Sequence, residues 1–96
     1  FDRMERIIMH YLGIDYGDRW IGLALGDDET NIASPFLTVE NNGEQTLIEL
    51  ETLVMAEGVD AIVVGVPFNP GQSDEQQEKT RAFIRELGYR VLCPLR

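Results

Sequence analysis

The feature that most constrains the fold is the segment DAIVVGV at residues 60–66, which is apolar without alternation after its first residue, Asp60. A strand with one face in water usually alternates apolar and polar residues, whereas this run does not alternate. A continuous apolar run is typical of a parallel strand that is covered by helices on both faces of its sheet. We therefore predict an α/β fold in which residues 60–66 form the central strand.

Two segments with helical spacing of their apolar residues flank this strand. Residues 43–57 follow Asn42, which is suited to a helix N-cap, and precede Gly58, a plausible stop. A second helix is expected to begin after Ser73, another good N-cap, and to end at Gly88. Strands that alternate with helices in this way are joined by right-handed crossovers.

The remaining apolar segments are short and favour strands. Residues 10–16 and 20–25 read as a hairpin around the turn at 17–19, and residues 34–39 read as a third, shorter strand. A fifth strand is expected in residues 89–96. The predicted order is β-β-β-α-β-α-β, a mixed five-stranded sheet with helices packed on it.

One acid interrupts the apolar face of the first predicted strand. Asp15 stands in the segment LGIDYG, and a buried carboxylate is unstable unless it is paired, protonated or bound to a cation. One interpretation is a ligand for a hard divalent ion such as Mg²⁺ in a phosphodiester-cleaving site. The other is that Asp15 lies near the end of the strand, where it caps the turn at Gly17 or pairs with Arg19.

A second segment of interest, VVGVPFNPGQS, leads from the central strand to the second helix. It passes through Gly65, Pro67 and Asn69 and reaches the helix at Ser73. Open α/β sheets commonly bind ligands at the carboxyl ends of their strands, and helix N-termini bind phosphate. Two acidic residues in the first turn of the helix oppose an anion there, since they already complement the helix dipole.

Two aromatic residues next to the first turn also have two interpretations. Tyr16 and Trp20 could stack on nucleobases. An aromatic side chain beside a strand more often packs in the core or against a hairpin. We therefore expect both rings to be packed.

The charges are distributed unevenly along the chain. The net charge is -9, and no Lys or Arg lies between Trp20 and Glu78. An acidic balance disfavours non-specific binding of nucleic acid, because such binding depends on neutralising phosphates. The basic residues near the C-terminus are expected to serve the second helix, in pairs such as Glu75 with Lys79.

The sequence shows no sign of a membrane segment or a secretory signal. The single Cys93 cannot form an internal disulfide, and no stretch approaches the roughly 20 apolar residues that span a bilayer. We expect a soluble, cytoplasmic protein with no membrane partner. Residues 1–8 precede Met9 and are expected to be an upstream extension or tag, which leaves residues 9–96 as a single domain.

Four stretches taken together carry a family resemblance. They are YLGIDYGDRWIGLALGD at residues 11–27, P-x-x-T at 35–38, GVDAIVVGVPFNPGQS at 58–73 and ELGYRV at 86–91. In these stretches the chain resembles the YqgF/RuvX family of Holliday junction resolvases and pre-16S rRNA nucleases. The resemblance implies a ribonuclease H-like fold over nearly the whole chain.

The resemblance also implies roles for particular residues. Asp15 matches the first metal-binding catalytic acid of the family, and Gly65, Pro67 and Asn69 match its loop after the fourth strand. The implied cofactor is Mg²⁺ or Mn²⁺, and the implied partner is nucleic acid, either an rRNA precursor or branched DNA.

Three further residues complete the expected site. Gly17 would allow a tight turn next to the acid, and Arg19 would contact a phosphate or pair with Asp18. Ser73 would join the loop after the fourth strand as a polar contact on the opposite wall.

Two features of the family pattern are missing from this chain. These are the acid of a D-E-R-L-[ST] signature just after the fifth strand and a further Asp on a last helix. We therefore expect a domain truncated at its C-terminus, with weak or no binding of the cation.

The predicted function is a metal-dependent nuclease that hydrolyses structured nucleic acid. The first alternative is a catalytically inactive module that binds nucleic acid or protein. The second is a nucleotide-binding half of the actin or sugar-kinase type. For an enzyme that acts on a two-fold junction, a homodimer is expected.

Overall fold

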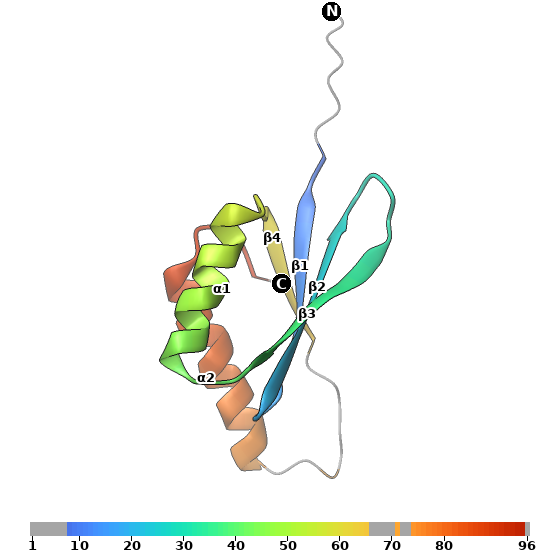
Figure 1. Ribbon diagram of the computed structural model, residues 1–96. Helices are drawn as coiled ribbons and strands as arrows, with labels where there is room; N and C mark the ends of the chain where they lie inside the picture. The colour runs from blue at the N-terminus through green and yellow to red at the C-terminus, as the bar shows by residue number, and fades with distance from the viewer. Residues whose placement is uncertain (1–7, 66–70, 72–73, 96) are drawn as a thin grey trace, which may run out of the picture.

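The computed structural model describes residues 8–65, 71 and 74–95. Figure 1 shows a sheet with two helices beside it. The elements in chain order are β1 (His10–Asp15), β2 (Trp20–Asp27), β3 (Ala33–Glu40), α1 (Glu44–Ala56), β4 (Ala61–Gly65) and α2 (Asp74–Arg90). None of the helices in this part of the chain is long and apolar enough to cross a lipid bilayer.

The sheet is mixed, as predicted, with the strand order β3-β2-β1-β4. β1 pairs with β2, and β2 with β3, in antiparallel fashion, whereas β1 and β4 are parallel. The α1 crossover therefore joins the antiparallel part to the parallel part, which confirms the predicted α/β class. The predicted central position of residues 60–66 is wrong for the described residues, because β4 is the last strand in this order and β1 and β2 are the interior strands.

The predicted fifth strand is wrong for the described residues, because α2 continues through Gly88 to Arg90. Leu87 is fully buried and Val91 nearly so, which extends the apolar stripe of the helix past the glycine. Arg90 also pairs with carboxylates on α1. After the helix, Leu95 makes only an isolated parallel bridge to Ile62.

Both helices lie on the same face of the sheet (Figure 1). The prediction that β4 is covered on both faces is therefore wrong for the described residues. Ile62 faces the helices and is fully buried, whereas Val63 points the other way and is 45% exposed. An apolar run gives the hydrophobicity of both faces but does not show which face another element covers.

The core lies between the sheet and the two helices. Alternate residues of β1 and β2 point into it, since successive side chains of a strand lie on opposite faces. Full burial of one such aliphatic side chain stabilises the fold by about 1.5–3 kcal/mol. The cluster comprises Leu12, Ile14, Ile21, Leu23, Leu47, Leu50, Val54, Val59, Ile62, Phe83, Leu87 and Val91.

Helix α1 begins differently from the prediction. Its N-cap is Gly43, in the left-handed region at φ 65°, and not Asn42. The backbone N–H of Asn42 instead donates to Thr46 Oγ1 at 2.8 Å, and that hydroxyl donates to the Glu40 carbonyl at 3.0 Å. Gly58 ends the helix at φ 63°, as predicted.

Candidate active site at the carboxyl end of the first strand

Asp15 is the last residue of β1, an interior strand of the sheet. Its Cα is paired with that of Gly22 on β2 and with that of Gly65 on β4. The residue therefore lies where the antiparallel and parallel parts of the sheet meet, at the carboxyl end of β1 and β4. This end of an α/β sheet is where ligands usually bind.

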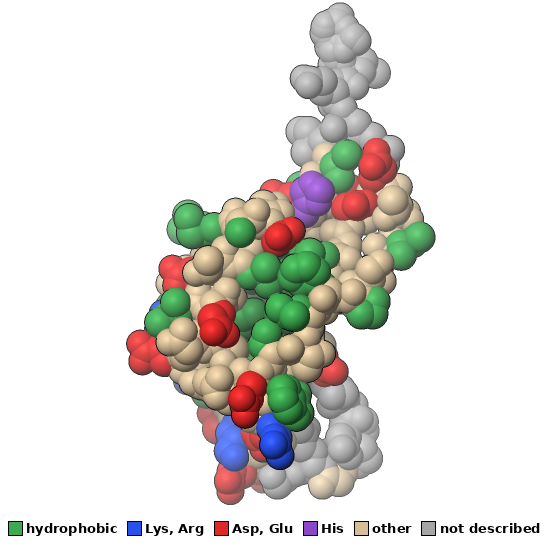
Figure 2. All heavy atoms as spheres, in the orientation of Figure 1, with side chains coloured by type: hydrophobic (Ala, Val, Ile, Leu, Met, Phe, Trp, Pro, Cys, Tyr) green, Lys and Arg blue, Asp and Glu red, His purple; other side chains and the backbone are tan. Residues whose placement is uncertain are grey.

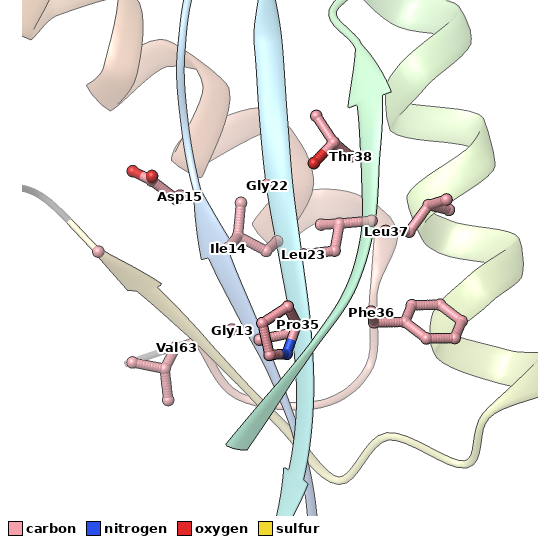
Figure 3. A pocket seen from close by; sticks show the side chains of 12 residues that line it. Gly13, Ile14, Asp15, Gly22, Leu23, Pro35, Phe36, Leu37, Thr38 and Val63 are labelled. Atoms are coloured by element: carbon pink, nitrogen blue, oxygen red, sulfur yellow. The ribbon is translucent and has the colours of Figure 1, made fainter.

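The side chain of Asp15 is exposed, and this corrects the expectation that it is buried. Leu12 and Ile14 point to the helices, so Asp15 points to the face that the helices leave open. In Figure 3 its carboxylate stands apart from the other labelled side chains. Among the described residues, none forms a hydrogen bond or an ion pair with this carboxylate.

The residues paired with Asp15 on the two neighbouring strands are glycines, which place no side chain next to it. A Cβ added to Gly22 would lie 3.7 Å from the Asp15 Cβ, and one added to Gly65 would lie 3.6 Å from the Ile14 carbonyl oxygen. Both distances are ordinary contacts, so larger side chains would stand directly beside the carboxylate. The glycines therefore keep the approach to Asp15 free from two directions.

A shallow groove runs from Asp15 across the open face, as Figure 3 shows from close by. Its volume is about 720 Å³. The lining is mostly small or apolar, and Asp15 is the only charged residue among the described residues that form it. The lining residues include Gly13, Gly22, Ala24, Pro35, Phe36, Leu37, Thr38, Val63 and Gly65.

The turn after Asp15 requires its glycine. A Cβ on Gly17 would lie 2.5 Å from the Trp20 carbonyl oxygen, which is closer than real Cβ contacts allow. The predicted role of Gly17 in a tight turn therefore has a geometric cause. The Gly17 carbonyl itself accepts a hydrogen bond from Asn41 Nδ2 at 3.1 Å.

Asn41 braces the same turn at a second point, because its backbone N–H donates to the Arg19 carbonyl at 2.8 Å. The sequence did not reveal this role. The motif Asn41-Asn42-Gly43 indicates a turn, but the partners of Asn41 lie more than twenty residues earlier in the chain. A contact of that kind leaves no local pattern.

Helix α2 holds the turn from the other side. Asp18 accepts a hydrogen bond from Gln76 Nε2 at 3.2 Å and lies 3.9 Å from Lys79 Nζ. The ring of Tyr16 lies 4.5 Å from that of Phe83, centroid to centroid. The expected packing of Tyr16 is thus confirmed, and so is the predicted Glu75–Lys79 pair, at 3.8 Å.

Trp20 was expected to pack, and Arg19 to pair with Asp18 or to contact a phosphate. Trp20 is 52% exposed, so the expectation that its ring is packed is wrong. The Arg19 guanidinium lies over that ring, 5.7 Å from its centroid. Among the ion pairs of the described residues, neither Asp15 nor Asp18 is paired with Arg19.

The loop after β4 is described only in part. Gly65 lies directly beside Asp15, as its pairing shows. Pro67, Asn69 and Ser73 lie outside the described residues. Their predicted roles as contacts on the opposite wall therefore stay predictions.

The described residues do not make up a metal site. A divalent ion bound by protein needs several oxygen ligands, and Asp15 supplies one carboxylate. Within residues 8–65, 71 and 74–95, no group of three His, Cys, Asp or Glu side chains lies close enough together to hold a metal ion.

The arrangement of strands and helices matches that of a solved structure. The RuvC protein of Thermus thermophilus, solved in complex with a Holliday junction substrate, superimposes with a TM-score of 0.65. The two chains are 17% identical, and the match covers 91% of this chain and 62% of RuvC. The fold is therefore of the ribonuclease H-like class, as the resemblance implied.

The family follows from the sequence comparison. The family model described as "RuvX: Holliday junction resolvase" matches residues 9–96, so the chain belongs to the RuvX family. Relatives named "Putative pre-16S rRNA nuclease" include one from Chloroflexus aggregans, 34% identical over 86 residues, and one from Orientia tsutsugamushi, 28% identical over 85 residues. The chain spans 61% and 54% of these relatives' lengths, respectively.

Proposed function

We propose that this chain carries the first catalytic carboxylate of a nuclease that acts on structured nucleic acid, and that Asp15 is that carboxylate. One observation carries the proposal. Asp15 is exposed and without a partner among the described residues, between two glycines, at the carboxyl end of an interior strand. A carboxylate with no structural role in the fold is available for chemistry.

The family supports the reaction class. The RuvX description names a Holliday junction resolvase, and the curated relatives are named for pre-16S rRNA. Both names imply hydrolysis of phosphodiester bonds in a folded or branched nucleic acid. The substrate class that we propose is the one shared by these names.

We propose Mg²⁺ or Mn²⁺ as the cofactor of the whole site, to which Asp15 would contribute one oxygen ligand. Such an ion lowers the pKa of bound water and stabilises charge on a phosphoryl oxygen. The residues around Asp15 have a different role, which is to hold its backbone in place. Gly17, Asn41 and Asp18 fix the turn that follows Asp15, so that the backbone position of Asp15 is set by the fold.

The test compares Asp15→Asn with Glu49→Gln, which removes one negative charge from the exposed side of α1. The protein tested is this chain extended to the length of its relatives, of which it spans 54% and 61%. Cleavage of a pre-16S rRNA fragment and of a four-way DNA junction is measured with Mg²⁺ or Mn²⁺, and cation binding is measured by calorimetry. We expect Asp15→Asn to abolish cleavage and to weaken cation binding, while Glu49→Gln leaves both unchanged.

Two outcomes would overturn the proposal. Cleavage that survives Asp15→Asn would remove Asp15 from the site. Binding of nucleic acid without cleavage under any cation would favour the alternative of an inactive interaction module.

A further inference from the structure

We propose that Trp20, with Arg19 over its ring, is a stacking site for an unpaired nucleobase next to Asp15. The substrate class is then nucleic acid that is single-stranded or locally unpaired at the reacting position. This inference rests on the proposed nuclease function and narrows its substrate.

The register of the sheet places Trp20 and Asp15 on the same face. Gly22 is paired with Asp15, and Trp20 precedes Gly22 by two residues on β2. Residues two apart in a strand share a face and lie about 7 Å apart along it. A base stacked on Trp20 would therefore have its backbone within reach of the Asp15 carboxylate.

About half of the Trp20 side chain is exposed, and the Arg19 guanidinium lies over its ring. The other aromatic residue of the turn, Tyr16, packs against Phe83 and is part of the core boundary. Trp20 makes no ring contact with a described aromatic residue, and it remains 52% exposed on a face where its strand neighbour is Gly22. The half-exposed ring is therefore accessible to a ligand from solvent.

The chemistry of the pair suits a nucleotide. Every base has a π-face that can stack on an indole ring, and arginine both stacks on aromatic rings and binds phosphate with its planar guanidinium. Arg19 is free for that task, because among the described residues no carboxylate pairs with it. Its backbone carbonyl is held by Asn41, so the position of the pair is fixed.

The charged residues around Trp20 also predict which substitution should strengthen the binding of nucleic acid. The carboxylate of Asp18 is partly balanced by Lys79, 3.9 Å away. Glu40 is the cross-strand partner of Trp20 on the same face, and cross-strand side chains are close neighbours. Its negative charge opposes an incoming phosphate, so removal of this charge should strengthen binding.

The test uses the fluorescence of Trp20, which is the only tryptophan of the chain. A single-stranded RNA of about ten nucleotides, within the range that stacking sites accommodate, is titrated in the presence of EDTA. A duplex of the same sequence is titrated in parallel. We expect the single strand to quench Trp20 at concentrations where the duplex does not, because only unpaired bases can stack on the ring.

Variants are compared by the anisotropy of a labelled single strand, since Trp20→Ala has no intrinsic signal. Loss of one stacking contact should weaken binding by roughly 5- to 150-fold in Trp20→Ala. Trp20→Phe should retain part of the affinity, and Glu40→Gln should bind more tightly than the wild type. The matched control is Tyr89→Ala, which removes an aromatic side chain that is 77% exposed on α2 and should leave binding unchanged.

The outcomes separate this inference from the proposed function. If cleavage depends on Asp15 but neither quenching nor a Trp20→Ala effect is seen, the nuclease stands and the stacking site is overturned. Equal quenching by the duplex also overturns it. If single strands quench Trp20 in the wild type and in Asp15→Asn, and no cleavage occurs, the stacking site stands and the nuclease function fails.

Discussion

At the scale of single residues, the candidate site depends on glycines, which have no side chain to fill the space around Asp15 and the turn that follows it. Asp15 is accessible because Gly22 and Gly65 flank it without side chains. Gly17 permits the turn because the Trp20 carbonyl oxygen occupies the place where a Cβ would stand. The local sequence showed these glycines clearly, but it did not show that Asp15 is exposed.

Gly17→Ala should destabilise the chain by about 1–3 kcal/mol, as overpacked positions usually do. The backbone must shift, since the added Cβ would lie 2.5 Å from the Trp20 carbonyl oxygen. The matched control is Gly88→Ala on α2, where a Cβ meets nothing within 4 Å. That control should stabilise the chain by about 1 kcal/mol through helix propensity. Urea unfolding measures the change in the free energy of unfolding for both variants, and equal changes would contradict the prediction.

Asp27 predicts a dependence of stability on pH. Hydrogen bonds lower the pKa of its carboxyl below the ordinary 3.8; the largest contribution comes from the backbone N–H of Thr30. A lowered pKa means that Asp27 stabilises the fold above its ordinary pKa, and that this contribution is lost as the pH falls through the lowered value. Asp27→Asn should therefore narrow the difference in urea midpoint between neutral pH and pH below 3.8. An unchanged difference would contradict this assignment.

At the scale of elements, helix α2 links the core to the turn beside Asp15. Phe83 is buried in the core cluster and also contacts the ring of Tyr16, to which it is tilted by 38°. One helical turn earlier, Lys79 approaches Asp18 at the surface. The two contacts differ in their exposure to water, and so they should differ in energy.

Phe83→Ala should destabilise the chain by about 3–5 kcal/mol, the range for a buried aromatic residue. Lys79→Ala should change the stability by less than about 1 kcal/mol, since the Lys79 and Asp18 side chains are both half exposed. Thermal or urea unfolding of the two variants provides the comparison. A large effect of Lys79→Ala would show that the ion pair, and not the aromatic contact, holds the turn.

The edge strand β3 should exchange its amide hydrogens faster than β1. β3 has one neighbour in the sheet order and is exposed along nearly all of its length, whereas β1 is paired on both sides. Segments with few buried contacts open at lower free energy. Hydrogen exchange followed by mass spectrometry tests this order, and equal protection of the two strands would contradict it.

Most elements could be predicted from sequence because their signals are local. The hairpin, the α1 helix and the parallel strand each have a periodicity or a turn residue of their own. The end of α2 could not be predicted, because Gly88 indicates a stop while the burial of Leu87 and Val91 carries the helix past it. Which face of the sheet the helices cover is decided by packing between distant segments, and so is the exposure of Trp20.

At the scale of the whole molecule, acidic charge dominates the surface, part of which Figure 2 shows. The net charge of the chain is -9. Such an excess repels nucleic acid at long range, so a binding site has to rely on local contacts such as those proposed for Arg19 and Trp20. The expected homodimer stays a prediction, which sedimentation equilibrium can test.

Added salt should raise the unfolding midpoint of the chain. The excess of negative charges repels itself in the compact state, and the Debye length falls to about 8 Å at physiological ionic strength. The surface ion pairs that salt weakens contribute little by comparison. Thermal unfolding in low salt and at physiological ionic strength, with a chloride salt of a monovalent cation, provides the measurement. A lower midpoint in salt would show that attractive pairs outweigh the repulsion.

Within the described residues the two helices cover one face of the sheet, and this has an evolutionary consequence. Neighbouring residues of β1 have different surroundings: Leu12 lies in the core, Gly13 and Asp15 line the open groove, and Ile14 is buried in the core and also borders the groove. Substitutions of residues that face the groove can alter ligand binding without disturbing the packing of the core. A lineage that keeps the buried residues can therefore explore new ligands, or lose its chemistry altogether, while it still folds.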